Sequence, residues 1–459
     1  MDHREGTGDG RTSPTAASGR TSEVDTARRE RGGGPLRSRR DLLCVSGGAA
    51  LSASIAGCTG VFGSAEAADD TLRLGVLAPD PDRSPIGASI AVTARFIAQQ
   101  TNATGGLLGK EIDVVVEDTK ASPLEARRAY ERLVLDEDVD ATVGVAESAV
   151  LDHLIEHIAD HETIHFTAGA TSQRVSELLA ADFDRYKYHF RTMLNDAQLL
   201  QLELSFIQSM LPELGFEAPY ELAILAEDYR WTDGVTEAYQ GAFAGIDNFD
   251  VVFAERYDPE IDDFRPLYSS VEDAGADVAW VVMAHTGNAA IVDWQRERPA
   301  FAFAGTHVPM QWPGYWDVVD GACEYAVSMT PGTPDAEITE ETQRFFQAYN
   351  EVTGGNYPVY TGYTTYDALR MYGDAVATAG TVDPETLIPY LEDVEVVATM
   401  AETYTFGDED YEYPHDPVWG PEYIEERPAS VYFQWQQGVQ EVIWPEPYAT
   451  ATYQRPPWM

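Results

Sequence analysis

Short apolar segments alternate with amphipathic helical segments along most of this chain, and the alternation runs through twice. The first run opens with an apolar strand predicted at residues 72–77, followed by helical spacing of apolar residues over 86–99. Strands joined in this way pair in parallel and are covered by helices on both faces. The first run is completed by strands predicted at 112–116, 141–145 and 164–167 and by helices predicted at 122–135 and 149–161.

The alternation restarts after a crossover predicted near residues 188–191, which indicates a second lobe. Strands are predicted at 221–226, 251–257, 278–283 and 301–305, with helices at 196–210, 234–244, 264–274 and 288–296. Helices at 339–353, 363–379 and 384–391 and strand-like pieces at 402–406, 431–437 and 439–444 follow. We therefore predict an α/β fold of two doubly wound, Rossmann-like lobes. No Gly/Ser-rich linker separates the lobes, so we expect several chain crossings and a hinged ligand cleft.

Acidic residues outnumber basic ones by 77 to 30 over 459 residues, which gives a formal net charge of −47. Binding to nucleic acid or to an anionic membrane surface depends on Lys and Arg, so this charge argues against both partners. Only Lys110, Lys120 and Lys187 are lysines. An acid excess of this size repels itself unless concentrated salt screens it. We therefore expect the protein of a salt-loving microbe.

Residues 1–57 are predicted to be an export signal. Ser38-Arg39-Arg40-Asp41 precedes a short apolar stretch at 42–56, an order that resembles a twin-arginine signal. The stretch ends in Ile55-Ala56-Gly57-Cys58, which resembles a lipobox and predicts lipid on Cys58 after cleavage. We expect a lipid-anchored protein on the extracellular face of the cell membrane, with 58–71 as a linker and no transmembrane helix. Cys323 would then be the remaining cysteine, so no disulfide is predicted within the chain.

Several short motifs occur in the order found in one family of binding proteins. They are Asn102-Ala103-Thr104-Gly105-Gly106, Val116-Glu117-Asp118-Thr119, Ala168-Gly169-Ala170-Thr171, Glu227-Asp228-Tyr229 and Gly362-Tyr363-Thr364-Thr365-Tyr366. Their order over residues 72–445 resembles the branched-chain amino acid-binding (leucine/isoleucine/valine-binding) family, type I periplasmic binding proteins of ABC transporters, here of haloarchaeal type. By this resemblance residues 72–190 and 327–400 would form the first lobe, and residues 191–326 and 401–459 the second lobe with the C-terminal tail.

The resemblance implies a monomer that captures a small polar solute and delivers it to an ABC permease and ATPase complex. The solute would belong to the branched-chain amino acid, amide or urea class. No cofactor and no enzymatic activity are implied. A ligand-binding sensor protein of the same fold is the alternative.

The resemblance places Ser148 and the turn Gly169-Ala170-Thr171 around the carboxylate of a bound ligand. Both segments follow the carboxyl ends of predicted strands and precede predicted helices. Free N–H groups and the positive end of a helix suit an anion at such a position, which is also where open α/β sheets bind ligands. The alternative is that Ser148 and Thr171 only cap helices.

In the second lobe, the resemblance places an aromatic residue over the ligand near Trp231; a packed core tryptophan is an equal alternative. The family binds the ammonium group of its ligand with a carboxylate after the strand at 301–305. Here that position is His307, which supplies no negative charge when neutral. This departure predicts a ligand without an α-ammonium group: an amide, urea or a carboxylic acid. His285 lies near another contact region, although structural hydrogen bonding is the favoured interpretation for it.

Other motifs are weaker. His153, His157, His161 and His165 recur every four residues, but they flank an apolar stripe, and no metal site is predicted. The chain has no G-x-S-x-G elbow, no P-loop and no dinucleotide fingerprint after the first strand. Family members often join the loops near Lys120 and Glu147 by a disulfide; neither residue is Cys here, and an ion pair between them is predicted instead.

Overall fold

The first lobe is built on a parallel sheet whose central strand is buried on both faces. The computed structural model describes residues 71–459, so the predicted signal, Cys58 and all but the last residue of the predicted linker lie outside the described residues. The strand order is β2-β1-β3-β4-β5, and every neighbouring pair is parallel. The strands are β1 (Thr71–Ala78), β2 (Glu111–Asp118), β3 (Ala141–Gly144), β4 (His165–Thr167) and β5 (His189–Arg191).

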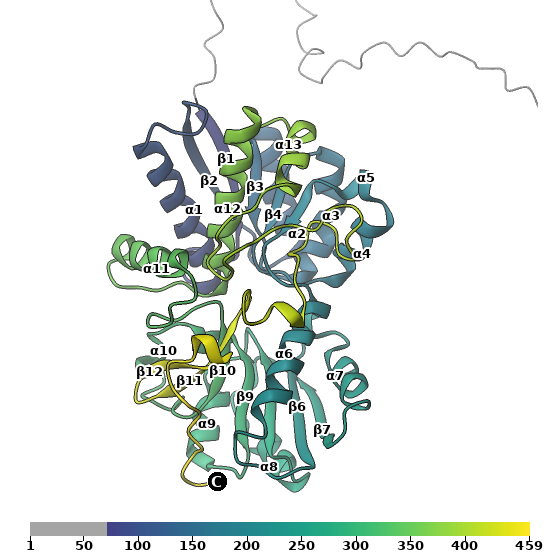
Figure 1. The fold of residues 1–459 in the computed structure, drawn as a ribbon, viewed down its shortest axis with the longest axis vertical. Helices are drawn as coiled ribbons and strands as arrows, with labels where there is room; N and C mark the ends of the chain where they lie inside the picture. Colours follow the sequence, from purple (N-terminus) through teal and green to yellow (C-terminus); the bar gives the residue numbers. More distant parts are fainter. Residues whose placement is uncertain (1–70) are drawn as a thin grey trace, which may run out of the picture. The chain divides into compact units, whose positions relative to one another are not determined.

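Helices cover this sheet (Figure 1), because each carries an apolar stripe that must be buried. From the first run come α1 (Pro85–Ala103), α2 (Pro123–Glu131), α3 (Ser148–His161), α4 (Gln173–Ala181) and the short α5 (Phe183–Tyr186). A π-helical turn at Arg132–Asp136 extends α2. From the later part of the chain come α11 (Glu340–Thr353), α12 (Tyr360–Ala379) and α13 (Pro384–Glu392), with α11 and α12 packing against α1.

The second lobe repeats the arrangement and adds a small antiparallel sheet. Its parallel sheet has the order β7-β6-β8-β9, from β6 (Tyr220–Glu227), β7 (Phe249–Tyr257), β8 (Val278–Met283) and β9 (Ala302–His307). The antiparallel sheet contains β10 (Val327–Thr330), β11 (Val431–Gln436) and β12 (Val439–Trp444). The helices are α6 (Asp196–Met210), α7 (Val235–Phe243), α8 (Arg265–Asp273), α9 (Ala289–Glu297) and α10 (Tyr315–Val318). The two parallel-sheet lobes confirm the predicted α/β fold class.

The chain crosses between the lobes three times within the described residues: between β5 and α6, between β10 and α11, and between α13 and β11. Two segments lie elsewhere than predicted. The strand β10, assigned to the first lobe by the boundary at 327, pairs with β11 of the second lobe. Tyr404 and Phe406, predicted to belong to a second-lobe strand, pack in the first-lobe core and form only isolated bridges. In both cases the deciding partner is distant in the sequence: β11 for β10, and Phe166 and Phe190 of the first-lobe sheet for Phe406.

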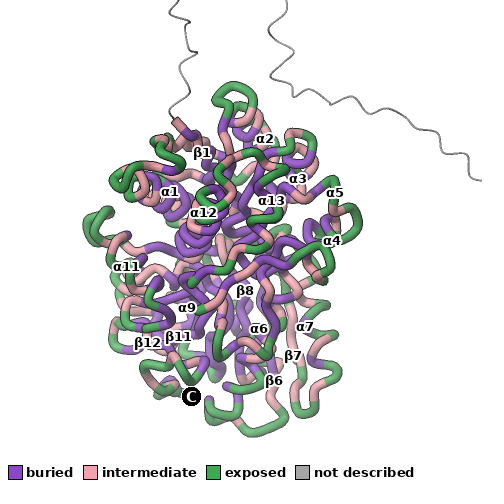
Figure 2. The backbone as a smooth tube through the Cα atoms, turned by 45° about the horizontal axis from the view of Figure 1, so that its top comes forward, coloured by how far each residue is buried: buried purple, intermediate pink, exposed green. Residues whose placement is uncertain are grey.

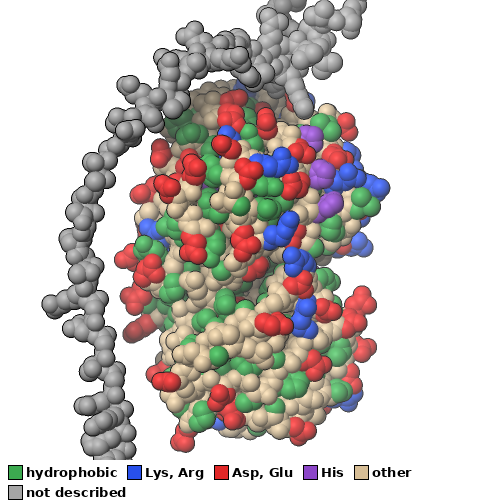
Figure 3. Space-filling model, turned by 90° about the vertical axis from the view of Figure 1, so that its right-hand side faces the viewer, with side chains coloured by type: hydrophobic (Ala, Val, Ile, Leu, Met, Phe, Trp, Pro, Cys, Tyr) green, Lys and Arg blue, Asp and Glu red, His purple; other side chains and the backbone are tan. Residues whose placement is uncertain are grey.

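The strands of the sheets are mostly buried, and most acidic side chains lie on the surface. Buried residues are concentrated along the strands, whereas loops and outer helix faces are exposed (Figure 2). Acidic side chains are scattered over the visible face of both lobes (Figure 3), as the composition requires. Within residues 71–459, no helix combines the length and apolar character needed to cross a membrane.

Candidate functional site

A cavity of about 680 Å³ lies between the two lobes. In the first lobe, β3 and β4 end at its wall; in the second, β6, β8 and β9 end there. The carboxyl ends of parallel strands leave loops and helix N-termini free to contact a ligand. The volume falls in the range of small-molecule sites. Of the predicted site residues, the cavity is lined by Ser148, Gly169, Thr171, Trp231 and His285.

The first-lobe wall offers hydrogen-bond donors. Ser148 is the first residue of α3, is only 4% exposed, and its Oγ has no hydrogen-bond partner. The N-cap position of α3 is Glu147, and that of α4 is Ser172, so Ser148 and Thr171 do not serve as the caps that were the alternative prediction. A buried hydroxyl without a partner is costly, and it sits beside the positive end of a 14-residue helix. This wall therefore suits an anionic or strongly accepting group.

The turn at Gly169 has no room for a side chain at this position. A Cβ at this position would lie 2.9 Å from Thr361 Cγ2 and 3.1 Å from the Tyr360 hydroxyl, because α12 begins directly against the turn. Ala170, predicted with Gly169 to let the backbone of the turn approach a ligand, has its side chain buried in the first-lobe core and does not itself line the cavity, so its role stays a prediction. Its carbonyl instead accepts a hydrogen bond from the Arg191 side chain.

The second-lobe wall is organised by a carboxylate that the sequence analysis did not assign. Glu227, at the end of β6, is fully buried and accepts hydrogen bonds from the backbone N–H groups of His285 at 2.8 Å and Thr286 at 2.9 Å. Trp231 Nε1 donates to it at 2.8 Å, and His285 Nδ1 lies 2.7 Å from it. Burial alone raises the pKa of Glu227, but the hydrogen bonds with His285 and Trp231 outweigh it and leave the pKa below the usual value. Glu227 therefore orients Trp231 and His285 towards the cavity.

His307, predicted to contact the ligand, is not among the residues that line the cavity. Its neighbours Thr306 and Val308 line the cavity, but its own side chain is fully buried and does not. Successive side chains in and beside a strand point to opposite faces, and the His307 ring packs between Phe303 and Tyr315, at 5.9 and 5.8 Å between ring centroids. Burial lowers the pKa of His307 to about 4, so the imidazole is neutral. The structure does not place His307 where it could accept a ligand's ammonium group.

A buried ion pair supports the first-lobe wall from behind. Arg191, at the end of β5, donates from Nε to Asp416 Oδ1 at 2.9 Å, and its other nitrogens donate to the carbonyls of Ala170 and Ser172, each at 2.9 Å. These carbonyls flank Thr171, so the guanidinium holds the binding turn in place. The local sequence contains no clear signal for this pair, because Arg191 follows His189 and Phe190 in a three-residue strand and its partner lies 225 residues away.

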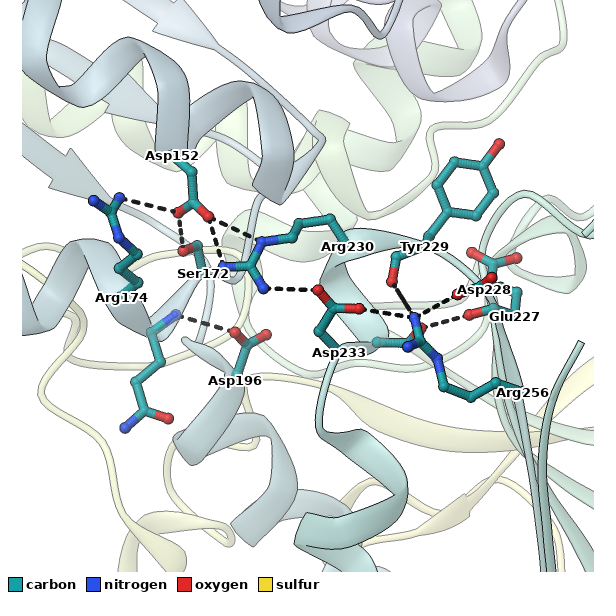
Figure 4. Close-up of polar contacts among 12 residues, drawn as sticks. Asp152, Ser172, Arg174, Asp196, Glu227, Asp228, Tyr229, Arg230, Asp233 and Arg256 are labelled. Carbon is teal, nitrogen blue, oxygen red and sulfur yellow. Dashed lines mark hydrogen bonds and ion pairs between the residues drawn. The ribbon is translucent and has the colours of Figure 1, made fainter. Parts of the chain in front are cut away.

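The lobes are also joined beside the cavity (Figure 4). Arg230 of the second lobe donates from Nε and Nη2 to Asp152 Oδ2 of α3, at 3.2 and 3.1 Å. On its other side Arg230 pairs with Asp233 at 2.9 Å, which also pairs with Arg256. The chain of charges therefore runs across the boundary between the lobes and ties the cavity wall containing Trp231 to α3.

We expect the Asp152–Arg230 pair to contribute measurably to the free energy of unfolding. A double-mutant cycle with Asp152→Asn and Arg230→Gln should give a coupling energy of about 0.5–1 kcal/mol, because the pair is doubly bonded but Arg230 stays partly exposed. Urea unfolding measures it. The exposed Asp263–Arg265 pair within the second lobe is the control and should couple more weakly, since it joins residues only two apart. A zero coupling for Asp152–Arg230 would contradict the expectation.

Two other predictions concern charges. Lys120 and Glu147 do not form the predicted ion pair; Lys120 Nζ lies 4.0 Å from Glu125 instead. On α3, the His153 and His157 rings lie 5.8 Å apart. Within residues 71–459, no group of three or more His, Cys, Asp or Glu side chains is placed to hold a metal ion.

Two α/β lobes with a cavity between their strand ends define the class of two-lobed, cleft-type binding proteins. The profile of the periplasmic binding protein family matches residues 71–419, more than half of the chain, so the chain belongs to this family. None of the curated proteins compared matches the chain.

Solved structures show the same fold at low sequence identity. A putative branched-chain amino acid ABC transporter protein from Silicibacter pomeroyi is 20% identical with a TM-score of 0.72, covering 85% of this chain and 100% of its own. A solute binding protein from R. palustris in complex with benzoate is 14% identical, with a TM-score of 0.67 and coverage of 85% and 99%. LivJ from Streptococcus pneumoniae in complex with isoleucine is 15% identical, with a TM-score of 0.66 and coverage of 82% and 100%.

Proposed function

We propose that this protein is the solute-binding component of an ABC importer, which captures a small polar solute outside the cell and delivers it to a permease and ATPase complex. The solute would belong to the branched-chain amino acid, amide or urea class. The observation that carries the proposal is the buried, unpartnered Ser148 hydroxyl at the start of α3, in a cavity between two lobes. Closure of the lobes around the solute would provide the signal to the permease.

Export and anchoring are part of the proposal. The twin-arginine pair Arg39-Arg40 and the lipobox ending at Cys58 support a protein held by lipid on the extracellular face of the membrane, where we propose that it acts as a monomer. The excess of 77 acidic over 30 basic residues supports a salt-loving source. Membership of the periplasmic binding protein family agrees with a role outside the cytoplasm.

Removal of the Ser148 hydroxyl tests its proposed role in solute binding. Ser148→Ala should weaken binding of a solute carboxylate about tenfold to a hundredfold, because one hydrogen bond to a charged group contributes about 1.5–3 kcal/mol, and binding of a neutral carbonyl about twofold to tenfold. Calorimetry in concentrated salt against leucine, acetamide, urea and benzoate measures the change. The stability should stay nearly constant, since the Ser148 side chain makes no capping hydrogen bond.

Ser209→Ala is the matched control, because Ser209 lies on α6 outside the cavity and its hydroxyl bonds only to backbone carbonyls of the same helix. It should leave binding unchanged. Equal affinities of wild type and Ser148→Ala for every solute that binds would contradict this placement of the ligand. Failure of wild type to bind any of the four solutes would count against the proposed solute class.

A further inference from the structure

Glu147 brings a carboxyl group to the cavity from the first lobe. It directly precedes α3 and lines the cavity. Its Oε2 is buried and has no hydrogen-bond partner, and its side chain makes no capping bond to the helix. Burying a carboxyl oxygen without a hydrogen-bond donor is costly. A bound ligand could supply the donor that Glu147 Oε2 lacks.

The surroundings of Glu147 place its carboxyl where the lobes meet. It interacts electrostatically with Tyr360 of the first lobe and with Tyr229 and His285 of the second, all of which line the cavity. His285 Nδ1 is already engaged by Glu227 at 2.7 Å, and the Tyr229 ring stacks on the His285 ring at 4.1 Å between centroids. Burial raises the pKa of Glu147, as expected for a carboxyl group without a close cation.

The other charged side chains that line the cavity have ion-pair partners. Lys120 pairs with Glu125, and Asp228 pairs with Arg256 at 2.8 Å. Arg230 and Asp233 pair with each other, as described above. Among the described residues that line this cavity, Glu147 is therefore the charged group left without a Lys or Arg partner. A solute that enters can satisfy it only by bringing a donor of its own.

We propose that Glu147 is a specificity-determining residue that accepts a hydrogen bond from an N–H group of the solute, an ammonium or an amide, while Ser148 binds its oxygen acceptor. The inference rests on the proposed function. Because the two residues are consecutive, the donor and the acceptor must lie close together on the solute. The cavity then favours amino acids and amides over carboxylic acids that carry no N–H group. The Glu147 carboxylate of the first lobe thereby supplies the negative charge that His307 of the second lobe does not. This reverses the expectation of a ligand without an α-ammonium group.

Calorimetry with two matched pairs of solutes tests this inference: leucine against 4-methylpentanoate, and benzamide against benzoate. Wild type should prefer the N–H-bearing member of a pair by about tenfold or more, since a hydrogen bond to a charged group is worth at least that much. Glu147→Gln should reduce the preference of leucine over 4-methylpentanoate to about threefold or less, because both the attraction of the ammonium and the repulsion of the plain acid are lost. Glu147→Met, whose uncharged thioether is at most a weak acceptor, should remove most of the preference in both pairs.

Glu351→Gln is the control, because Glu351 is an exposed residue of α11 outside the cavity and its replacement removes the same charge. It should keep the wild-type preference. An unchanged preference in Glu147→Gln and Glu147→Met would overturn the inference; if Ser148→Ala still weakened binding, the proposed function would stand. Wild type that binds plain acids as well as their N–H counterparts would also overturn the inference alone. Absence of binding by all four solutes would overturn the inference and count against the proposed solute class.

Discussion

Replacement of Arg191 by Met is expected to lower the free energy of unfolding by about 3–5 kcal/mol. The guanidinium is fully buried, and so is its partner Asp416. Methionine has an unbranched side chain that fills much of the same space, but it leaves the Asp416 carboxylate buried without its cation, which is the costly part of breaking a buried pair. Urea unfolding followed by circular dichroism, at constant concentrated salt, measures the loss.

Two variants control for other effects of the substitution. Arg265→Met removes an exposed guanidinium that pairs with Asp263 and should change stability by no more than about 1 kcal/mol. Arg191→Met combined with Asp416→Leu removes both buried charges and should recover part of the loss. If Arg191→Met alone lost less than about 1 kcal/mol, the buried pair would not have the stabilising role that its geometry indicates.

The same pair connects stability to binding. Arg191 holds the carbonyls on both sides of Thr171, and Asp416 also accepts hydrogen bonds from Asn195 and Ser176. Asn195 caps α6, the first element after the chain leaves the first lobe. One buried cluster therefore fixes both the binding turn and the start of a connection between the lobes.

Transfer from about 3 M to about 0.1 M KCl is expected to unfold the protein. The net charge of −47 is screened over roughly 3 Å or less in concentrated salt, but over about 10 Å at the lower concentration. Repulsion among carboxylates then acts across neighbouring side chains over both lobes, and it destabilises the compact state. Circular dichroism during dialysis should show loss of the native spectrum, with recovery when salt is restored.

A neutral osmolyte separates screening from dehydration in this experiment. Sucrose added at low salt favours burial without screening charge, so it should recover less structure than KCl of equal osmotic strength. A native spectrum at about 0.1 M KCl would contradict both the repulsion argument and the proposal of a salt-loving source.

The positions of several site residues could be predicted from the sequence, but the chemistry of the site could not. Ser148, Gly169 and Thr171 follow strand ends whose positions the apolar pattern predicted, and the structure brings all three to the cavity. Their role in binding stays a prediction. Glu147 was considered only as a partner of Lys120, because sequence neighbours do not reveal which carboxyl group will be buried without a cation.

The placement of His307 shows why such assignments fail. A shift of one position along a strand moves a side chain to the opposite face, and motif order alone does not give that precision. Thr306 reaches the cavity and His307 packs in the core.

The amino-acid sequence by itself determined the class of fold and most element positions: the segments predicted at 196–210 and 278–283 are α6 and β8 with the same bounds. Helix and strand periods are local, so a window of residues contains the signal. Only the tertiary structure decided that β10 pairs with β11, that Arg191 meets Asp416, and that Glu147 lines the cavity between the lobes. Those contacts join segments far apart in the sequence, and they depend on where the chain crosses between lobes, which no local pattern encodes.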